Sequence, residues 1–409
     1  MTYQEKLQKL KNLCKNESEY YNSNIDLIAA STFLRKEIAF FNDYSIQRSM
    51  EGLLNKRPYA GTRNLDEIEQ MGVNAAKKVF NSEYANLQPH SGSQANQIVY
   101  SAFLNPGDTV LSMSFDSGGH LTHGNPINFS GRFYKFIHYG INPLTQTIDY
   151  AQLQDLAIKN SPKIILAGAS SYPLKIDYKF IKEIAKEIGA DFVVDMAHPA
   201  GIIAAGEFPS PVLFADAVTT STEKTLHGPH AGLILAKEKH AKIIDKATHP
   251  GVQSSVPINR IVQSTIALLY AQTDDFKRYI HETLESAQIL AEAFQQIPKC
   301  LMFNGTDSHF IVIDVLNGFG ITGKEAEQTL EKINIFTNRQ IIPWETKKVY
   351  ETSGLRIGTQ AACARGINKN DFVKISEFII SALQNPNDVS LLNDLRQKIQ
   401  NMALNHSIL

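Results

Sequence analysis

The spacing of hydrophobic positions predicts alternating strands and helices in the middle of the chain. Four short apolar runs have the length and composition of buried strands, at residues 108–113, 163–169, 191–197 and 216–222. Between the second and third runs, residues 178–190 carry apolar side chains at helical spacing, with a glycine near the end. Strands that alternate with helices predict an α/β fold, in which helices cover both faces of a mostly parallel sheet.

The pattern changes after about residue 280, where a smaller α+β unit is expected. A long helix, roughly residues 259–296, is predicted to bridge the two parts of the chain. Beyond it we expect a strand, a helix, a second strand and a last helix, at residues 308–315, 323–334, 356–359 and about 370–384.

The chain is accordingly predicted to have three parts. Residues 1–60 have the pattern of helical segments and loops, and we expect them to form an arm that contacts a partner subunit. Residues 61–280 are predicted to form a large α/β domain, and residues 281–409 a smaller C-terminal α+β domain.

Composition and charge exclude several classes of protein. In 409 residues, hydrophobic side chains make up 43% and charged ones 20%, as is usual for a soluble globular protein. A net charge of −1 offers no basic surface for nucleic acid or an anionic membrane. The three cysteines are far apart, which predicts neither a metal site nor a disulfide framework. The sequence has no recognisable signal peptide or membrane-spanning run, so we expect a cytoplasmic protein.

Polar residues follow several of the predicted strands. Asp195 ends the third run with His198 three residues beyond it, while Ser170 follows the second run and Lys224 the fourth. Ligands collect at the carboxyl ends of the strands in such sheets. An aspartate at the end of a strand caps the following helix about as often as it has a functional role. A lysine in a partly buried site tends to have a lowered pKa, which is what a Schiff-base lysine requires.

An earlier stretch has the pattern of a phosphate site. Residues 87–105 pass from a short strand through Ser91, Gly92 and Ser93 into an apolar helix. Small residues at a helix N-terminus leave backbone N–H groups free to bind an anion, although such a sequence is also common as a turn and N-cap. A phosphate site, an aspartate and a lysine are together what pyridoxal phosphate needs. The carboxylate keeps the pyridine nitrogen protonated, and the amine forms a Schiff base with the cofactor.

Two further motifs carry candidate side chains. His120 and His123 have an H-x-x-H spacing that a metal could use, but no carboxylate follows at the spacing of a zinc protease, and glycines flank both. Stacking of a histidine on an aromatic ring fits this stretch better, and no metal is predicted. Arg356 lies on a predicted strand of the smaller unit, where its planar fork could bind a carboxylate; a surface ion pair is the alternative.

These motifs occur in an order that resembles the serine hydroxymethyltransferase family. The matching segments are NLQPHSGSQAN, GGHLTHG, AGAS, VVDMAH, STEKTLHGPHAG, GKEAEQTL and TSGLRIGT, and the likeness extends from about residue 20 to 385. The resemblance implies a fold-type I pyridoxal-phosphate transferase of the aspartate aminotransferase class. It also implies an amino-acid substrate and a homodimer with active sites at the subunit interface.

The resemblance further implies roles for residues at matching positions. Lys224 matches the Schiff-base lysine, Asp195 the partner of the pyridine nitrogen, and His120 the imidazole that stacks on the ring. The other cofactor contacts would come from Ser91, Gly92, Ser93, Gln94, Ser170, His198, Ser221, Ser254 and Ser255. Substrate contacts are expected from Ser31, Ser49, Glu51, Tyr59, His230 and Arg356. Of these, the arginine would hold the substrate carboxylate and the tyrosine would come from the partner subunit. The glutamate would transfer a proton, for which burial should raise its pKa.

Several positions near the lysine depart from the family's pattern. Glu223 stands where the family has a histidine, and His230 and Ser49 stand where it pairs an arginine with a tyrosine. Ser254 and Ser255 replace a glycine pair, so side chains occupy space that glycine leaves free.

Other departures lie in the substrate and folate regions. Residues 27–33 are LIAASTF where the family has LIASENF. Ala30 therefore stands where the family has a serine that contacts the substrate carboxylate, and Ser31 is the next residue. Phe115 replaces a leucine, and Trp344 replaces an asparagine that contacts the pterin. An apolar ring cannot make the hydrogen bonds of an amide, so the use of folate is left open.

Three activities therefore stand as hypotheses. The first is transfer of a hydroxymethyl group from L-serine to tetrahydrofolate, which breaks the Cα–Cβ bond of a β-hydroxy amino acid. The second is a folate-independent relative, such as a β-hydroxy-amino-acid aldolase, a transaldolase or a specialised biosynthetic enzyme. The third is a catalytically silent homologue that acts as a binding protein, against which the retention of Lys224, Asp195, His120 and Arg356 argues.

Overall fold

The centre of the fold is a seven-stranded sheet in the order β2–β8–β7–β6–β5–β3–β4. The structure is a computed structural model that describes residues 1–33, 35–41 and 51–406. The strands are β2 (Tyr84–Asn86), β3 (Thr109–Met113), β4 (Lys135–Tyr139), β5 (Ile164–Ala167), β6 (Asp191–Asp195), β7 (Ala217–Ser221) and β8 (Gly232–Ala236). From β4 to β7 all neighbours are parallel, whereas β8 is antiparallel to both β7 and β2. The four predicted strands correspond to β3, β5, β6 and β7, which confirms a mostly parallel sheet.

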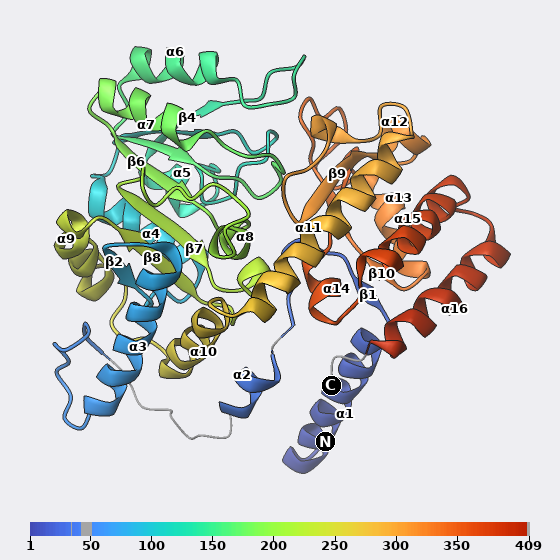
Figure 1. Ribbon diagram of the computed structural model, residues 1–409, viewed down its shortest axis with the longest axis horizontal. Coiled ribbons are helices and arrows are strands. Elements are labelled where there is room, and N and C mark those ends of the chain that lie inside the picture. The colour runs from blue at the N-terminus through green and yellow to red at the C-terminus, as the bar shows by residue number, and fades with distance from the viewer. Residues whose placement is uncertain (34, 42–50, 407–409) are drawn as a thin grey trace.

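Alternate residues of each strand pack on opposite faces of this sheet, because successive side chains point to opposite sides. In β5, Ile165 and Ala167 belong to one buried cluster and Ile164 and Leu166 to another. The first cluster includes residues of α3 (Arg63–Phe80), α6 (Tyr150–Asn160), α7 (Tyr178–Glu187), α8 (Ala200–Ala204) and α10 (Ile258–Tyr270). The second is covered by α4 (Gly92–Phe103), α5 (Phe129–Phe133) and α9 (Ala241–Lys246). The expected three-layer α/β arrangement, with a helix beginning at residue 178, is thus confirmed (Figure 1).

A smaller antiparallel sheet, in the order β11–β12–β9, forms the centre of the C-terminal part. Its strands are β9 (Phe310–Asp314), β11 (Asn338–Gln340) and β12 (Gly354–Gly358). The helices here are α12 (Val315–Phe319), α13 (Gly323–Lys332), α14 (Gln360–Ala364), α15 (Lys369–Gln384) and α16 (Val389–Asn405). The elements predicted in this part correspond to β9, α13, β12 and α15. The sequence pattern did not reveal α16, which follows α15 after a four-residue connection.

The predicted long helix over residues 259–296 is wrong in one respect, because it is two helices. After α10 ends at Tyr270, Thr273 accepts a hydrogen bond from the backbone N–H of Phe276 and caps α11 (Asp274–Gln295). Two acidic residues occupy the first turn of α11, where they interact favourably with the positive end of the helix dipole. In Figure 1, α11 runs from beside the large sheet toward the C-terminal part, so the bridging role belongs to α11.

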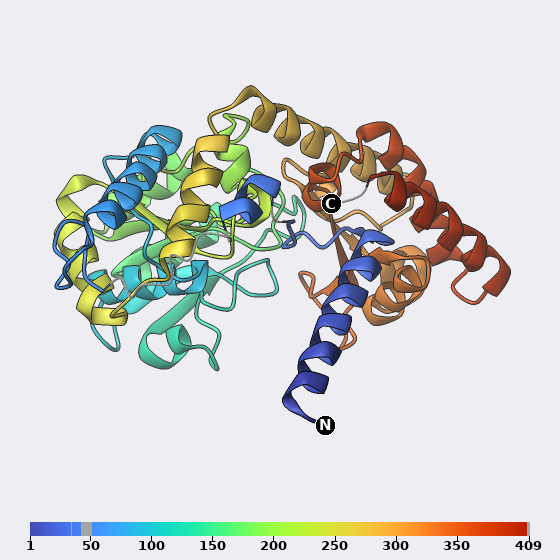
Figure 2. The same cartoon turned by 90° about the horizontal axis from the view of Figure 1, so that it is seen from below.

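The N-terminal region contributes to the core of the C-terminal part. β1 (Ile25–Asp26) pairs in parallel with β10 (Ile335–Phe336), and Ile25 and Leu27 are buried in the same cluster as the helices around β9. In contrast, α1 (Tyr3–Asn22) has no buried residue in the described chain, and it projects from the molecule in Figure 2. The predicted boundaries at residues 60 and 280 stay predictions.

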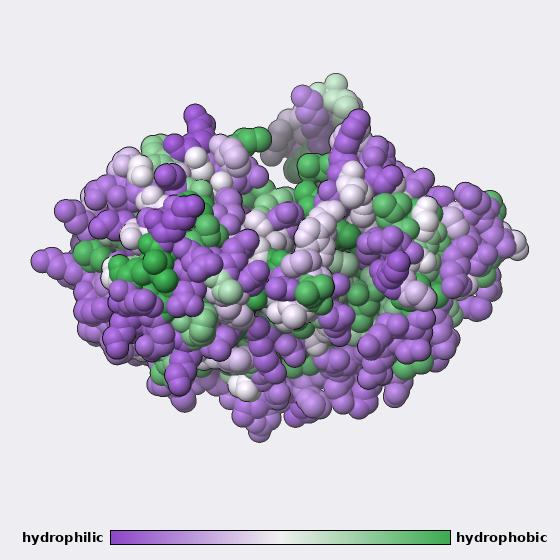
Figure 3. Space-filling view, turned by 90° about the horizontal axis from the view of Figure 1, so that it is seen from above, coloured by the Kyte–Doolittle hydropathy of each residue, from purple (hydrophilic) through white to green (hydrophobic). Residues whose placement is uncertain are grey.

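The remaining described elements are short. They are α2 (Lys36–Phe40), η2 (Lys224–Leu226), η3 (Glu238–His240), η4 (Ala247–Val252) and η5 (Met302–Asn304). Across the described residues, the helices are too short or too polar to cross a membrane. The face seen in Figure 3 is mostly hydrophilic, with hydrophobic side chains gathered in small groups.

Candidate active site

A cavity of about 430 Å³ lies where the carboxyl ends of β5, β6 and β7 meet the N-terminus of α4. Its lining brings together many of the predicted site residues: Ser91, Gly92, Ser93, His120, Ser170, Asp195, His198, Ser221, Lys224, His230 and Arg356. The lining also includes Ala30, Phe115, Leu121, Ala169, Ala197, Glu223 and Gln340. Residues from both sheets therefore meet at the edge that the sequence pattern indicated.

Asp195 is held by three hydrogen-bond donors at the end of β6. Its Oδ2 accepts from His123 Nε2 at 3.1 Å and from Asn96 Nδ2 at 2.8 Å, and its Oδ1 accepts from the backbone N–H of Ala197 at 3.0 Å. Burial alone would raise the pKa of Asp195, but the hydrogen bond and charge of His123 outweigh it. The pKa therefore lies well below its usual range, and the carboxylate is ionised.

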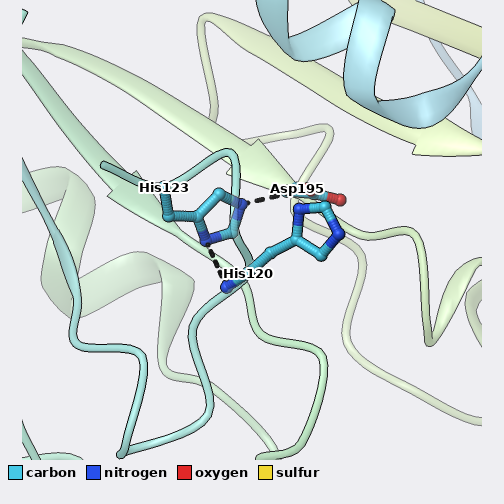
Figure 4. Close-up of side chains that lie close together, drawn as sticks. All are labelled: His120, His123 and Asp195. Atoms are coloured by element: carbon cyan, nitrogen blue, oxygen red, sulfur yellow. Dashed lines mark hydrogen bonds and ion pairs between the residues drawn. The ribbon is translucent and has the colours of Figure 1, made fainter. Parts of the chain in front are cut away.

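His120 lies beside this carboxylate with a neutral imidazole (Figure 4). Burial, with the neighbouring charge of His123, lowers the pKa of His120 to about 4. Its Nδ1 lies 2.8 Å from Thr122 Oγ1, and its backbone N–H donates to His123 Nδ1 at 3.3 Å. A neutral ring fixed in this way is suited to stack on a flat aromatic ligand.

Asn96 on α4 connects three neighbouring segments. Its amide donates to both Asp195 and Thr122, and its carbonyl oxygen accepts from Thr219 Oγ1 on β7 at 2.5 Å. The sequence interpretation did not identify Asn96 or the role of His123 at Asp195. The H-x-x-H spacing was a signal for the histidine, whereas an asparagine in an apolar helix gave none.

Lys224 follows β7 and lines the cavity, with its side chain half-buried. Burial lowers the pKa of its ammonium, while the carboxylates of Glu223 and Asp195 act in the opposite direction. The residue adopts a left-handed backbone conformation, with φ of 60°. A conformation that costs energy for a side-chain-bearing residue is typical of functional sites.

His198, which lines the cavity, belongs to a pair of stacked imidazoles. Its ring lies parallel to that of His309, with centroids 5.5 Å apart, and His309 Nε2 also lies 3.1 Å from the carbonyl oxygen of Ala29. Burial lowers the pKa of both rings, to about 3 for His309. His309 was not predicted, because its partner is 111 residues away in the sequence.

Arg356 enters the cavity from β12 of the smaller sheet. Its Nη1 donates to the carbonyl oxygen of Ser170 at 2.5 Å, and its Nε donates to Asn338 Oδ1 at 3.2 Å. Burial lowers the pKa of Arg356 to about 10, so the guanidinium is charged at neutral pH. Neither hydrogen bond uses Nη2, which leaves a donor for an anionic ligand.

The opposite end of the cavity fits a phosphate group. Ser91 caps α4 by accepting a hydrogen bond from the backbone N–H of Gln94, and Gly92 is the first helical residue. A Cβ on Gly92 would lie 3.2 Å from the Cβ of Ser221, so the absence of a side chain keeps this cradle open. Ser221 Oγ is buried without a hydrogen-bond partner among the described residues. An orphaned hydroxyl beside free helical N–H groups matches the oxygens of a bound phosphate.

Among the residues that the structure describes, two clusters of side chains have the spacing of metal ligands. His120, His123 and Asp195 form the first, but Asp195 Oδ2 already accepts hydrogen bonds from two donors. The second consists of Asp191, Asp216 and His240, where Lys182, Lys237 and Lys239 all pair with Asp216. Three ammonium groups around one carboxylate disfavour a further cation. In the first cluster, Asp195 Oδ1 accepts from a single donor, so it can accept one more hydrogen bond, as from a protonated pyridine nitrogen.

Several predicted site residues lie outside the cavity of this chain. Glu51 accepts a hydrogen bond from the Tyr59 hydroxyl at 2.5 Å, which lowers rather than raises its pKa. The expectation that burial would raise the pKa of Glu51 is therefore wrong for the single chain, where the side chain is partly exposed. The others outside the lining are Ser31, Gln94, Ser254 and Ser255, and Ser49 lies outside the described residues.

The fold and the site together define a class, the fold-type I pyridoxal-phosphate-dependent transferases with a mostly parallel central sheet. Comparison with known proteins narrows the class further. The family model described as serine hydroxymethyltransferase matches residues 4–379. The chain belongs to the serine hydroxymethyltransferase family.

Relatives named serine hydroxymethyltransferase cover nearly the whole chain. The protein of Lactobacillus gasseri is 40% identical over 417 residues, which is 100% of both chains. Those of Mycoplasma mycoides subsp. mycoides and Mesoplasma florum are 44% and 43% identical and cover 93% and 95% of this chain, and 93% and 94% of their own. Enzymes of this family use pyridoxal phosphate, with tetrahydrofolate as co-substrate.

Proposed function

We propose that this chain interconverts L-serine and glycine, with pyridoxal 5'-phosphate as cofactor and tetrahydrofolate as the acceptor of the one-carbon unit. The observation that carries the proposal is the placement of Lys224. It lies half-buried at the carboxyl end of β7, in one cavity with the ionised Asp195 and the charged Arg356. One cavity thereby combines an amine (Lys224), a carboxylate (Asp195) and a guanidinium that can bind a substrate carboxylate (Arg356).

Each end of the cofactor has a suitable group in this cavity. The N–H groups at the start of α4, with Ser91, Ser93 and Ser221, would bind the phosphate. The ionised Asp195 carboxylate would accept a hydrogen bond from the pyridine N–H and so keep that nitrogen protonated, and His120 would lie against the ring. When bound, the cofactor supplies an electron sink for a bond broken at the substrate α-carbon.

Arg356 would orient the substrate through its carboxylate. Because Ser170 and Asn338 fix the guanidinium, the arginine presents Nη2 in one direction and the bound amino acid cannot rotate freely. His198, whose pKa is lowered by burial and by the charges of Lys224 and Arg356, would stay neutral and serve as a hydrogen-bonding partner rather than as a cation.

We further propose a cytoplasmic homodimer in which the partner completes the site. Glu51, Tyr59, Ser254 and Ser255 lie together, linked by a bridge between Glu51 and Ser255, but outside the cavity of their own chain. In a twofold dimer the same groups of a second copy could line the cavity from outside. The apolar side chains that α1 exposes are suited to the same interface.

The proposal is tested first by the absorbance of the purified protein. The wild-type chain should bind pyridoxal phosphate, and borohydride should fix the cofactor covalently to Lys224, as peptide mass spectrometry would detect. Lys224→Ala should lose this attachment, whereas Lys186→Ala, an exposed position on α7, should keep it. A wild-type protein that takes up no cofactor would contradict the proposal and indicate a silent homologue.

The choice of acceptor is tested separately. Addition of glycine with and without tetrahydrofolate should change the absorbance of the bound cofactor, and tetrahydrofolate should enhance the change strongly. Cleavage of threonine-like substrates with no response to tetrahydrofolate would instead indicate a folate-independent aldolase.

A further inference from the structure

Glu223 places a second carboxylate in the cavity beside the lysine. Its side chain is 14% exposed, and its Oε1 lies 3.3 Å from His230 Nδ1. Its Oε2 is buried and has no hydrogen-bond partner among the residues that the structure describes. One oxygen of this carboxylate is therefore held by a histidine, and the other is left without a donor inside the cavity.

A buried carboxylate oxygen without a donor is costly, since it loses its hydration and gains no hydrogen bond in return. The cost is larger for a charged group than for a neutral polar one. A ligand that brings a hydrogen-bond donor, above all a positively charged one, would offset it.

The surroundings of Glu223 indicate which donor fits. Lys224 is the next residue, and the amino group of any substrate that displaces its nitrogen must arrive beside it. Arg356 lines the same cavity and offers a positive charge for a carboxylate. An α-amino acid at neutral pH carries one ammonium and one carboxylate, so a carboxylate and a guanidinium in one cavity match its two charges.

We propose that Glu223 binds the α-ammonium group of the incoming amino acid through Oε2, so that Glu223 and Arg356 together recognise the zwitterion. The proposal rests on the proposed function, since it concerns the substrate of that reaction. His230 has a positioning role. It lies on the solvent side of the pair, 69% exposed, and holds Oε1 so that Oε2 is directed inward.

The experiment separates binding from catalysis. The holoenzyme is first reduced with borohydride, which fixes the Lys224 nitrogen to the cofactor and prevents any ligand from becoming covalent. Calorimetry then compares glycine with glycolate, which has the same size and carboxylate but a hydroxyl in place of the ammonium. Wild type, Glu223→Gln, Glu223→Asp and the exposed control Glu183→Gln are measured at one pH.

Wild type should bind glycine at least about tenfold more tightly than glycolate, the effect expected of one charged hydrogen bond. Glu223→Gln should lose about tenfold in glycine affinity and leave glycolate within about twofold. Glu223→Asp, which keeps the charge, should recover part of the loss, and Glu183→Gln should match wild type.

Equal binding of the two ligands by wild type would overturn the proposal without any variant. So would a Glu223→Gln protein that loses both ligands alike or neither. Failure of the proposed function has a different signature, because a protein that takes up no cofactor cannot be fixed by borohydride before any ligand is added.

Discussion

Replacement of Asp195 by asparagine tests the central hydrogen-bond network most directly. The carboxylate accepts from three donors, namely His123 Nε2 and Asn96 Nδ2 on one oxygen and the backbone N–H of Ala197 on the other. An asparagine side chain offers only one acceptor oxygen, and its amide nitrogen brings two further hydrogens.

Both orientations of the new amide leave donors facing each other. If the oxygen takes the place of Oδ2, the NH₂ group faces the N–H of Ala197; if it takes the place of Oδ1, the NH₂ group faces both His123 and Asn96. The better orientation still leaves one buried donor unsatisfied, which costs about 1–3 kcal/mol. Asp195→Asn should therefore lower the free energy of unfolding of the cofactor-free protein by about this amount.

Urea denaturation of the cofactor-free protein at pH 7 and fixed protein concentration measures the change, so that neither cofactor nor dimer affinity enters the comparison. Asp155→Asn, on the exposed side of α6, provides the control and should change stability by less than about 0.5 kcal/mol. The reasoning is refuted if Asp195→Asn is as stable as this control, because the three donors would then not depend on the carboxylate.

Three further outcomes follow from the site and its surroundings. Gly168→Ala should destabilise the protein and impair cofactor binding far more than Gly189→Ala. A Cβ on Gly168 would lie 2.1 Å from the carbonyl oxygen of Asp195, whereas a Cβ on Gly189 would meet open space. Thermal unfolding and cofactor titration compare the two variants, and equal effects would argue against the close approach at Gly168. Arg356→Lys should raise KM for L-serine by at least about tenfold while cofactor absorbance stays unchanged, because an ammonium cannot reproduce the two parallel hydrogen bonds of a guanidinium. An unaltered KM would contradict the binding of the substrate carboxylate by Arg356. Burial lowers the pKa of His227 from 6.5 to about 4, so its contribution to stability is complete above pH 6.5 and is lost as the pH falls toward 4. His227→Gln should therefore show a shallower decrease of Tm over this range than wild type, and parallel curves would rule out His227 as a cause.

The strands and the residues at their ends could be predicted from the sequence, because both follow from local pattern. Buried parallel strands are short apolar runs, and their carboxyl ends meet at one edge, which is why Asp195, Lys224 and Ser170 were expected together. Arg356 required more than this, since it comes from the other sheet, and the pattern alone left it open between a ligand and an ion pair.

The rest could not be predicted because it depends on contacts between distant segments. Asn96 and Asp195 are 99 residues apart, and His198 and His309 are 111 apart, so no local spacing reveals either pair. The break between α10 and α11 was missed for another reason, because apolar periodicity continues across it and only the cap at Thr273 marks the new start. The roles proposed for Glu51 and Tyr59 require a second chain, and no pattern within one chain determines how two copies associate.

One helix, α4, couples the two ends of the cavity. Its first residue, Gly92, belongs to the cradle for an anion, and Asn96, four residues later, holds Asp195. A helix rises about 1.5 Å per residue, so these two contacts are separated by about 6 Å along a rigid axis. The spacing between the anion cradle and the hydrogen bond that holds Asp195 is thus set by one turn of backbone rather than by flexible loops. A shift of α4 would move both contacts together. A substitution that tilts or slides this helix therefore changes the anion cradle and the hydrogen bond to Asp195 at the same time.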